Sequence, residues 1–235
     1  MEILDNMPHD RLYKDPKTGL FAHQAMIKIG KDGNGEETLE EIREPITDQL
    51  ALEFLEHLES MPVDDHVSAT HRIQFSGVLK RIKDVYDDYR YRDRINSNIF
   101  APTAAIYLFK HLNKYIPNHS LILADFDCFL EPISDNSLLG INSPLVTNKL
   151  KEPTKWTQYD TYLIPRGSSD ICFPSDFQYL KHAYQQITNQ PSSIYKNRDF
   201  VDMFALPDWA TTQNNYNPMR EEYINTSFLV TEYKK

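Results

Sequence analysis

The chain has 235 residues, of which 40% are hydrophobic and 25% charged, with a net charge of −9 and a pI near 5.3. This length allows one sizeable core. The acidic balance argues against a nucleic-acid backbone as the main partner, because phosphate binding requires a basic surface. We also expect no membrane span, because no run approaches the roughly 20 apolar residues that cross a bilayer.

The first elements along the chain are predicted to be β-hairpins within residues 9–44. Two segments, Asp15–Gly19 and Lys31–Gly35, carry proline or glycine where a tight turn requires them. The residues between these turns alternate roughly between apolar and polar, which is the period of a strand.

Three helices are predicted to follow. The first covers residues 47–61 and ends before Pro62, with Leu50 and Phe54 on one apolar face. The second covers residues 72–94. Its end, "YDDYRYRDR", is interpreted as a solvated face with internal ion pairs, or alternatively as a partner-binding patch. The third covers residues 102–115.

The segment "SLILADFDCFL", residues 120–130, differs from these helices because four apolar residues run without interruption into two acids. Such a run is typical of a strand that is buried on both faces of a parallel sheet. Asp125 and Asp127 then lie at the carboxyl end of the strand, where open α/β sheets bind ligands.

The remaining elements predict an α/β arrangement. We expect a strand at 159–165, a helix at 174–187 with Ser175 as its N-cap, and a last strand at 227–233. Long loops are expected at about 131–158 and 190–225.

Sequence motifs for metal or nucleophilic catalysis are absent. The chain has no G-x-S-x-G elbow, phosphate-binding Walker loop or H-E-x-x-H pair, and His66 and His71 are expected to be surface or loop residues. Cys128 and Cys172 lack zinc-site spacing and are expected to be reduced, buried thiols. We therefore predict no metal site.

Carboxylates at predicted strand ends form the candidate site. If the strands are neighbours, their acids would line an acidic cleft that suits a cationic side chain such as guanidinium. One of the acids could also accept a proton from that substrate. The alternative is that each acid only caps a helix or binds a loop amide. The candidate acids are Glu2, Asp5, Asp125, Asp127, Asp170 and Asp176.

Four blocks, "EILDNMPHD", "LILADFD", "INSPLVTNK" and "YLIPRGSSDICFPSDFQYL", resemble the MidA-type S-adenosylmethionine-dependent methyltransferases. The segments "DNMPHD" and "NSPLV" most resemble the sequences of the fungal mitochondrial branch of this family. Glu2, Asp5 and Pro8 match the family's N-E-x-x-D-x-x-P segment, with Met1 in place of its asparagine. The family's acid on its fifth strand matches Asp125.

A second family motif matches further along the chain. It reads P-G-x-x-D-[IL]-x-x-x-x-D-F, and Arg166 is an irregularity because it stands between the proline and the glycine. The matching residues are Pro165, Asp170, Ile171, Asp176 and Phe177.

The resemblance implies a class I methyltransferase (Rossmann-like) fold: a twisted, mostly parallel sheet with an antiparallel final strand, plus an inserted helical subdomain at about residues 47–117. In such a fold the first strands and the glycine loop that holds the cofactor precede Glu2. The chain is therefore expected to be the C-terminal part of a methyltransferase domain, or a shortened relative, in which no cofactor-binding residue is identified.

The resemblance also implies a function. The enzyme hypothesis is methyl transfer from S-adenosylmethionine to a protein arginine, with Glu2 and Asp5 as the catalytic acids that orient the substrate. Asp125, Asp127, Asp170 and Asp176 would bind substrate or shape the cleft. The resemblance further implies a mitochondrial location and a protein substrate such as a respiratory complex subunit. The alternative hypothesis is a non-catalytic binding or assembly module that lacks the cofactor half.

Overall fold

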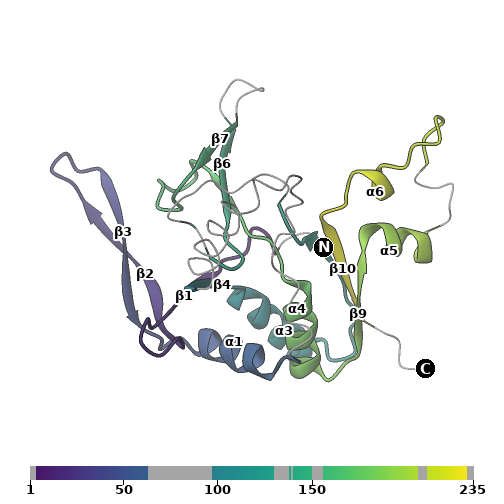
Figure 1. The fold of residues 1–235 in the computed structure, drawn as a ribbon, viewed down its shortest axis with the longest axis horizontal. Helices are drawn as coiled ribbons and strands as arrows, with labels where there is room; N and C mark the ends of the chain where they lie inside the picture. Colours follow the sequence, from purple (N-terminus) through teal and green to yellow (C-terminus); the bar gives the residue numbers. More distant parts are fainter. Residues whose placement is uncertain are drawn as a thin grey trace, which may run out of the picture.

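The computed structural model describes residues 4–62, 97–129, 138, 140–149, 156–205 and 211–231 (Figure 1). Three small sheets and a layer of helices make up this part of the chain. Among the described residues, none of the helices is both long and apolar enough to cross a bilayer. The predicted helix at 72–94 and residues Glu2, His66 and His71 lie outside the described ranges.

The first sheet confirms the predicted hairpins. It contains β1 (Asp10–Lys14), β2 (Phe21–Lys31), β3 (Glu37–Pro45) and β4 (Asn98–Ala101) in the order β3-β2-β1-β4, with every pair antiparallel. Gly19 and Gly35 have φ values of 71° and 86°, so both turns use the backbone freedom of glycine. The outer parts of β2 and β3 form a two-stranded ribbon that projects from the body (Figure 1).

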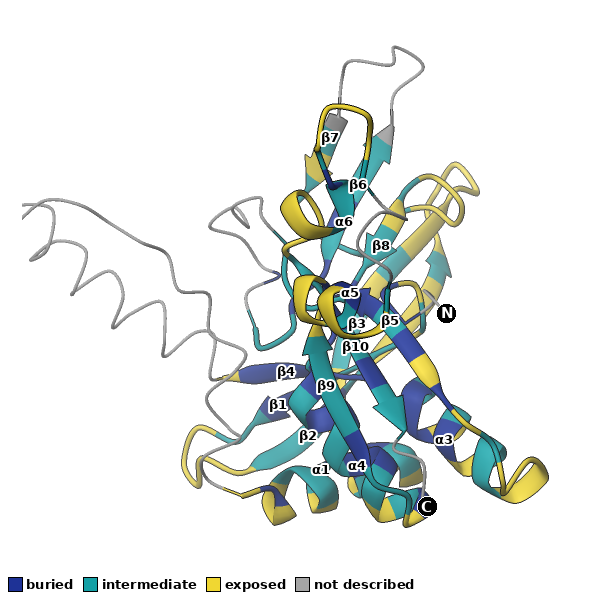
Figure 2. Ribbon diagram, turned by 90° about the vertical axis from the view of Figure 1, so that its right-hand side faces the viewer, coloured by how far each residue is buried: buried dark blue, intermediate teal, exposed yellow. Residues whose placement is uncertain are grey.

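Three helices pack together beneath the sheets: α1 (Gln49–Ser60), α3 (Thr103–Tyr115) and α4 (Phe177–Thr188). Their inward faces are apolar and aromatic; the rings of Phe54 and Tyr179, for example, lie 4.7 Å apart. Figure 2 shows these helices buried on one side and exposed on the other. The first and third predicted helices are confirmed within a few residues; the N-cap of α1 is Asp48, whose side chain accepts a hydrogen bond from Ala51 N.

The second sheet corrects the prediction for "SLILADFDCFL". β5 (Ile122–Phe126) pairs with β10 (Thr226–Thr231), and β10 pairs with β9 (Ser192–Lys196), both in antiparallel register. β5 also alternates in burial, with Ile122 54% exposed and Leu123 buried. The prediction of a parallel partner and two buried faces is therefore wrong for the described residues, although β5 and β9 run parallel to each other on either side of β10.

The third sheet, β7-β6-β8, lies where the sequence predicted a loop and a different strand. It contains β6 (Leu145–Lys149), β7 (Trp156–Tyr159) and β8 (Asp170–Cys172). The strand predicted at 159–165 is wrong beyond its first residue, because the Thr161 hydroxyl accepts a hydrogen bond from Leu163 N and forms a turn.

The second predicted loop is also partly wrong. Residues 190–225 contain β9, α5 (Asn197–Phe204) and α6 (Pro218–Glu221). The last predicted strand is confirmed by β10. The helix predicted at 174–187 is confirmed as α4, but Asp176 and not Ser175 is its N-cap.

Candidate functional site

Asp125 connects the N-terminal segment to the end of β5. Its Oδ2 accepts hydrogen bonds from the backbone N–H groups of Leu4 and Asp5, at 2.6 and 3.2 Å, and its Oδ1 accepts one from Phe126 N at 2.8 Å. Asp125 is only 1% exposed. A buried carboxylate needs several such donors to remain favourable, and here the donors come from segments 120 residues apart. Asp125 therefore fixes the backbone that carries Asp5.

A second set of contacts holds the same segment from its other side. The carbonyl of Asp5 accepts a hydrogen bond from Phe173 N at 2.7 Å, and Ser175 N donates to the carbonyl of Phe126 at 2.8 Å. The His9 imidazole stacks on the Phe173 ring, with centroids 4.0 Å apart and planes 11° from parallel. The segment after β8 therefore contacts both the N-terminal segment and the end of β5. We call the group Leu4, Asp5, His9, Asp125 and Phe173 the acid corner.

Sequence reasoning did not assign a role to His9. Its Nδ1 lies 2.9 Å from the carbonyl oxygen of Met7, and burial lowers its pKa to about 4. A neutral imidazole with Nδ1–H donating to Met7 satisfies both observations. The signal available in the sequence was only its place within "DNMPHD", because stacking on a ring 164 residues away leaves no local pattern.

The charges of the acid corner lie close to one another. Burial, and secondly the charge of Asp5, raise the pKa of Asp125 above its usual range. Burial and the charges of Asp5, Asp170 and Asp125 raise the pKa of the Cys172 thiol to about 11. Three predicted acids thus share one neighbourhood, and Cys172 within it is a neutral thiol at physiological pH.

The cysteine prediction holds only in part. Cys128 and Cys172 are both free thiols, but each is half-buried and not fully buried. Burial, and secondly the charge of Asp127, raise the pKa of Cys128. Among the residues that the structure places, no group of three or more His, Cys, Asp or Glu side chains has the arrangement of a metal site.

Asp5 is the acid best placed for chemistry among those described. Its Oδ1 accepts a hydrogen bond from Asn6 Nδ2 at 2.9 Å, and within the described ranges its Oδ2 accepts none. The residue is 6% exposed. A carboxylate with one uncommitted oxygen on a fixed backbone can bind a guanidinium N–H.

Asp127 has different partners from the residues of the acid corner. It forms an ion pair with Lys196 on β9 and accepts a hydrogen bond from the Ser227 hydroxyl on β10, so its carboxylate joins all three strands of the sheet. We call Asp127, Lys196 and Ser227 the paired corner. The Asp127 charge is matched by a lysine, while the prediction that Asp127 and Asp125 act at one cleft rim stays a prediction.

The last two predicted acids have different local surroundings. Asp176 caps α4, with its Oδ1 accepting hydrogen bonds from Gln178 N at 3.0 Å and Tyr179 N at 3.1 Å. Asp170 is exposed and begins β8, whereas the sequence placed it after a strand. The helix-capping alternative therefore describes the contacts of Asp176, while its role toward a substrate stays a prediction.

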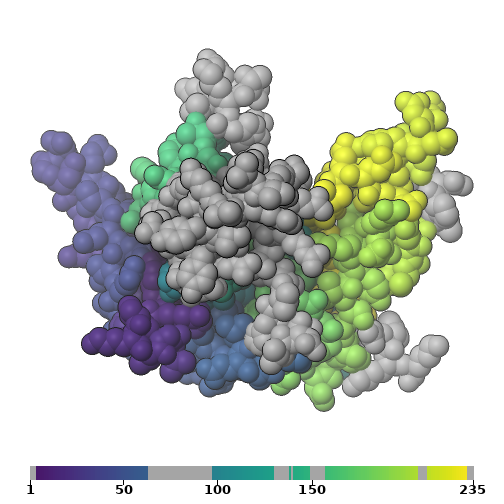
Figure 3. All heavy atoms as spheres, in the orientation of Figure 1, coloured from purple at the N-terminus to yellow at the C-terminus, as the bar shows by residue number. Residues whose placement is uncertain are grey.

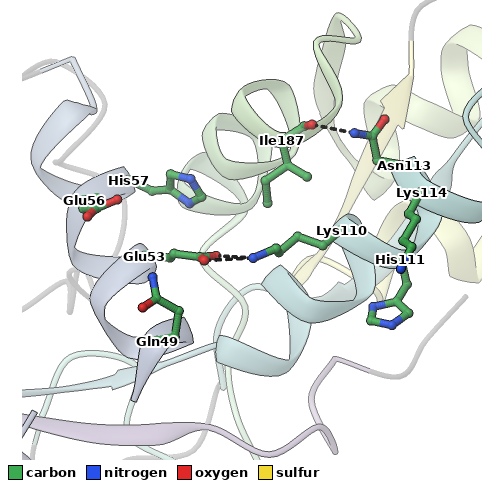
Figure 4. A pocket seen from close by; sticks show the side chains of 9 residues that line it. All are labelled: Gln49, Glu53, Glu56, His57, Lys110, His111, Asn113, Lys114 and Ile187. Atoms are coloured by element: carbon green, nitrogen blue, oxygen red, sulfur yellow. Dashed lines mark hydrogen bonds and ion pairs between the residues drawn. The ribbon is translucent and has the colours of Figure 1, made fainter. Parts of the chain in front are cut away.

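A hollow of about 730 Å³ lies away from these acids, among α1, α3 and α4 (Figure 4). The Glu53 carboxylate and the Lys110 ammonium form an ion pair across it at 2.8 Å, and Asn113 donates to the Ile187 carbonyl at 2.9 Å. The charges of Glu53 and Lys110 neutralise each other, and none of the residues that line the hollow belongs to the acid corner. The hollow therefore lies outside the candidate site.

S-adenosylmethionine requires a backbone loop that approaches the cofactor closely, usually rich in glycine at the start of a helix. Among the described glycines, Gly19, Gly33 and Gly35 lie in hairpin turns and Gly30 lies within β2. Gly140 and Gly167 precede strands. By this criterion the described residues do not fit the cofactor.

Comparisons with known proteins identify the family of this chain. Residues 1–195 match the model of a family described as "Putative S-adenosyl-L-methionine-dependent methyltransferase". The chain is also similar to the mitochondrial protein arginine methyltransferase NDUFAF7 homolog of Saccharomyces cerevisiae, with 27% identity over 137 residues. That match covers 56% of this chain and 34% of the relative, so it spans about a third of the relative's length. The family match covers most of the sequence, and the chain belongs to this family of S-adenosyl-L-methionine-dependent methyltransferases.

Proposed function

We propose that this protein takes part in methyl transfer from S-adenosylmethionine to a protein arginine, and that its acid corner binds the guanidinium. The observation that carries the proposal is the pair of hydrogen bonds from Leu4 N and Asp5 N to Asp125. These bonds fix the segment in which the family motif places Glu2 and Asp5. A fixed carboxylate can hold a guanidinium in one orientation, which is the main requirement when the methyl donor is already activated.

The roles of the acids follow from their contacts. Asp5 would bind guanidinium N–H groups through Oδ2 and draw positive charge away from the attacking nitrogen. Glu2 would act beside it, three residues earlier in the same motif. Asp125 would act through Asp5 as a positioning residue, because its own oxygens are occupied by backbone donors.

The class I methyltransferase fold is part of the same proposal. Two features of the second sheet support it: the strand order β5-β10-β9 and the antiparallel direction of the final strand β10. The resemblance implies such a final strand. A helical insertion at about 47–117 also remains a proposal; its described part contains α1, β4 and α3.

The substrate and location are proposed from the relative. The yeast protein is named as a mitochondrial arginine methyltransferase, which supports arginine and the mitochondrion for this chain. A respiratory complex subunit as the methylated protein stays a prediction from the resemblance.

The test is methyl transfer to an arginine-containing protein by the complete natural protein and its Glu2→Gln and Asp5→Asn variants. A charge-assisted hydrogen bond contributes roughly 1.5–3 kcal/mol, so each change should slow turnover on the order of tenfold to a hundredfold. Thermal melts of the variants should stay near that of the wild type. Unchanged turnover together with a collapsed melt would show that the acids are structural.

The second candidate is a non-catalytic binding or assembly module, and the poor fit of the described residues to the cofactor favours it. Calorimetric titration of the 235-residue chain with S-adenosylmethionine separates the two candidates. We expect weak binding by this chain alone. Micromolar affinity would show that the chain itself holds the cofactor and would remove the main argument for the module.

A further inference from the structure

The ribbon formed by the outer parts of β2 and β3 is an unusual surface feature. It runs through nine consecutive residue pairs, from His23 with Pro45 to Lys31 with Glu37, without a bulge. In the order β3-β2-β1-β4, β3 is the edge of its sheet and has no second strand partner within the described residues. Figure 3 shows the ribbon extending from the body of the molecule. An edge of this kind presents unpaired backbone N–H and C=O groups.

The ribbon also exposes apolar side chains. Met26 is 42% exposed, Ile27 is 43% exposed and Ile29 is 54% exposed. The register places Ile29 beside Leu39 on one face, while Met26 lies beside Ile42 on the other. An isolated two-stranded ribbon is only marginally stable in water, and a third strand would cover part of this surface.

The base of the ribbon is held firmly. The Glu41 carboxylate accepts hydrogen bonds from the Tyr13 hydroxyl and from Arg11, the latter at 3.3 Å. The Arg43 guanidinium lies 3.8 Å from the centre of the Tyr13 ring. These contacts join β3 to β1 across β2, so the edge strand has a defined position before anything binds to it.

Charge identifies the kind of partner. β3 carries four glutamates against one arginine, a net charge of −3, and the two lysines of β2 that lie opposite Glu37 and Glu40 offset only part of it. A second copy that paired β3 against β3 would bring the glutamates of both copies together, and like charges placed opposite each other destabilise a sheet. A basic strand would instead pair its cations with Glu37, Glu40 and Glu44.

We propose that the edge of β3 binds an extended basic segment of a partner protein, which adds a strand to the β3-β2-β1-β4 sheet. Backbone hydrogen bonds along β3 supply the pairing, and lysine or arginine side chains of the partner neutralise the glutamates. This surface is independent of the acid corner and of the proposed methyl transfer.

The experiment uses a ten-residue peptide that alternates lysine with valine, and a control peptide with glutamate in place of lysine. Amide chemical shifts of the isotope-labelled protein report where each peptide binds. The basic peptide should shift the amides of β3 and slow their hydrogen exchange, with an affinity that falls as salt rises. The acidic peptide should not bind.

Two matched double variants test the role of charge. Glu37→Gln with Glu40→Gln should weaken binding of the basic peptide by about fivefold, without placing like charges opposite Lys31 and Lys28 of β2. Glu56→Gln with Glu59→Gln changes the net charge equally on α1 and should leave the affinity within about twofold. Both glutamates in each pair are exposed.

Three results would overturn the proposal. The first is a basic peptide that shifts amides elsewhere and leaves β3 unchanged. The second is equal binding of the acidic and basic peptides to the wild type. The third is concentration-dependent dimerisation that protects the β3 amides, because a second copy would then occupy the edge.

Discussion

The acid corner and the paired corner lie at the same end of β5, but their carboxylates differ in burial and in the groups that bind them. Asp125 is almost fully buried and is satisfied by three backbone N–H groups. Asp127, two residues later, is satisfied by side chains, and its partner Lys196 is 54% exposed. A regular strand would place residues two apart on the same face, but β5 ends at Phe126, before Asp127, and the two carboxylates have different partners. A carboxylate bound by backbone N–H groups fixes the chain, whereas one bound by an exposed lysine mainly neutralises charge.

The same substitution at both corners gives the largest contrast. Asp125→Asn keeps the volume but replaces one acceptor oxygen with an NH₂ group that faces backbone donors. Because a buried donor left without a partner costs about 1–3 kcal/mol, we expect a loss of roughly 3 kcal/mol in the free energy of unfolding. Denaturant titration measures this loss. A change below about 0.5 kcal/mol would mean that Asp125 does not hold the N-terminal segment.

The His9 prediction concerns the pH dependence of the acid corner. The pKa of His9 is about 4 in the folded protein and 6.5 when unperturbed, so the unfolded chain binds more protons between these values. Stability from neutral His9 is therefore complete above pH 6.5 and is lost as the pH falls towards 4. We expect this loss to reach about 2 kcal/mol, since the imidazole is half-buried.

His9→Phe isolates this effect because it keeps a ring against Phe173 and removes the titrating group. As the pH falls from 6.5 to 4, the melting temperature of the wild type should fall relative to that of the variant. Comparison with the variant is necessary because burial raises the pKa of Asp125, which makes its contribution more favourable as the pH falls. Parallel melting curves over this range would contradict a His9 that is held neutral in the folded protein.

The sequence predicted local structure better than it predicted pairing. Features that depend only on residues close in sequence were predicted, and the structure confirms them. They are the apolar faces of α1 and α3 and the turns at Gly19 and Gly35. The partner of β5 could not be predicted in this way, because β10 lies about 100 residues away. β9 is only five residues long, "SSIYK", and gives little periodic signal.

The candidate site shows the same division. The family motifs identified Asp5 and Asp125 as candidate site residues, and the structure places the two residues in contact. Position along a strand could not show that Asp127 is paired with Lys196, because the two residues are 69 positions apart. The contact between His9 and Phe173 was missed for the same reason.

Asp176 provides an intermediate case, because its carboxylate binds backbone N–H groups but lies at a helix end and not in the acid corner. Asp176→Ala removes the cap of α4 and should cost about 1 kcal/mol. Asp176→Asn keeps a capping oxygen and should cost only a few tenths of this. Thermal melts of the two variants measure the difference. Equal and large losses would indicate that the negative charge at this position matters more than the hydrogen bonds.

Asp127→Asn is the smallest expected effect and completes the comparison. The amide oxygen can still accept a hydrogen bond from Ser227, so the variant loses mainly the attraction to Lys196. Ion pairs with an exposed partner contribute about 0–1 kcal/mol, and we expect a loss near 0.5 kcal/mol that shrinks as salt is added. Lys196→Met should give a similar loss, and the double variant should lose little more than either single one. If Asp127→Asn instead cost as much as Asp125→Asn, the Asp127 carboxylate would be fixing the three strands, and the two corners would not differ in kind.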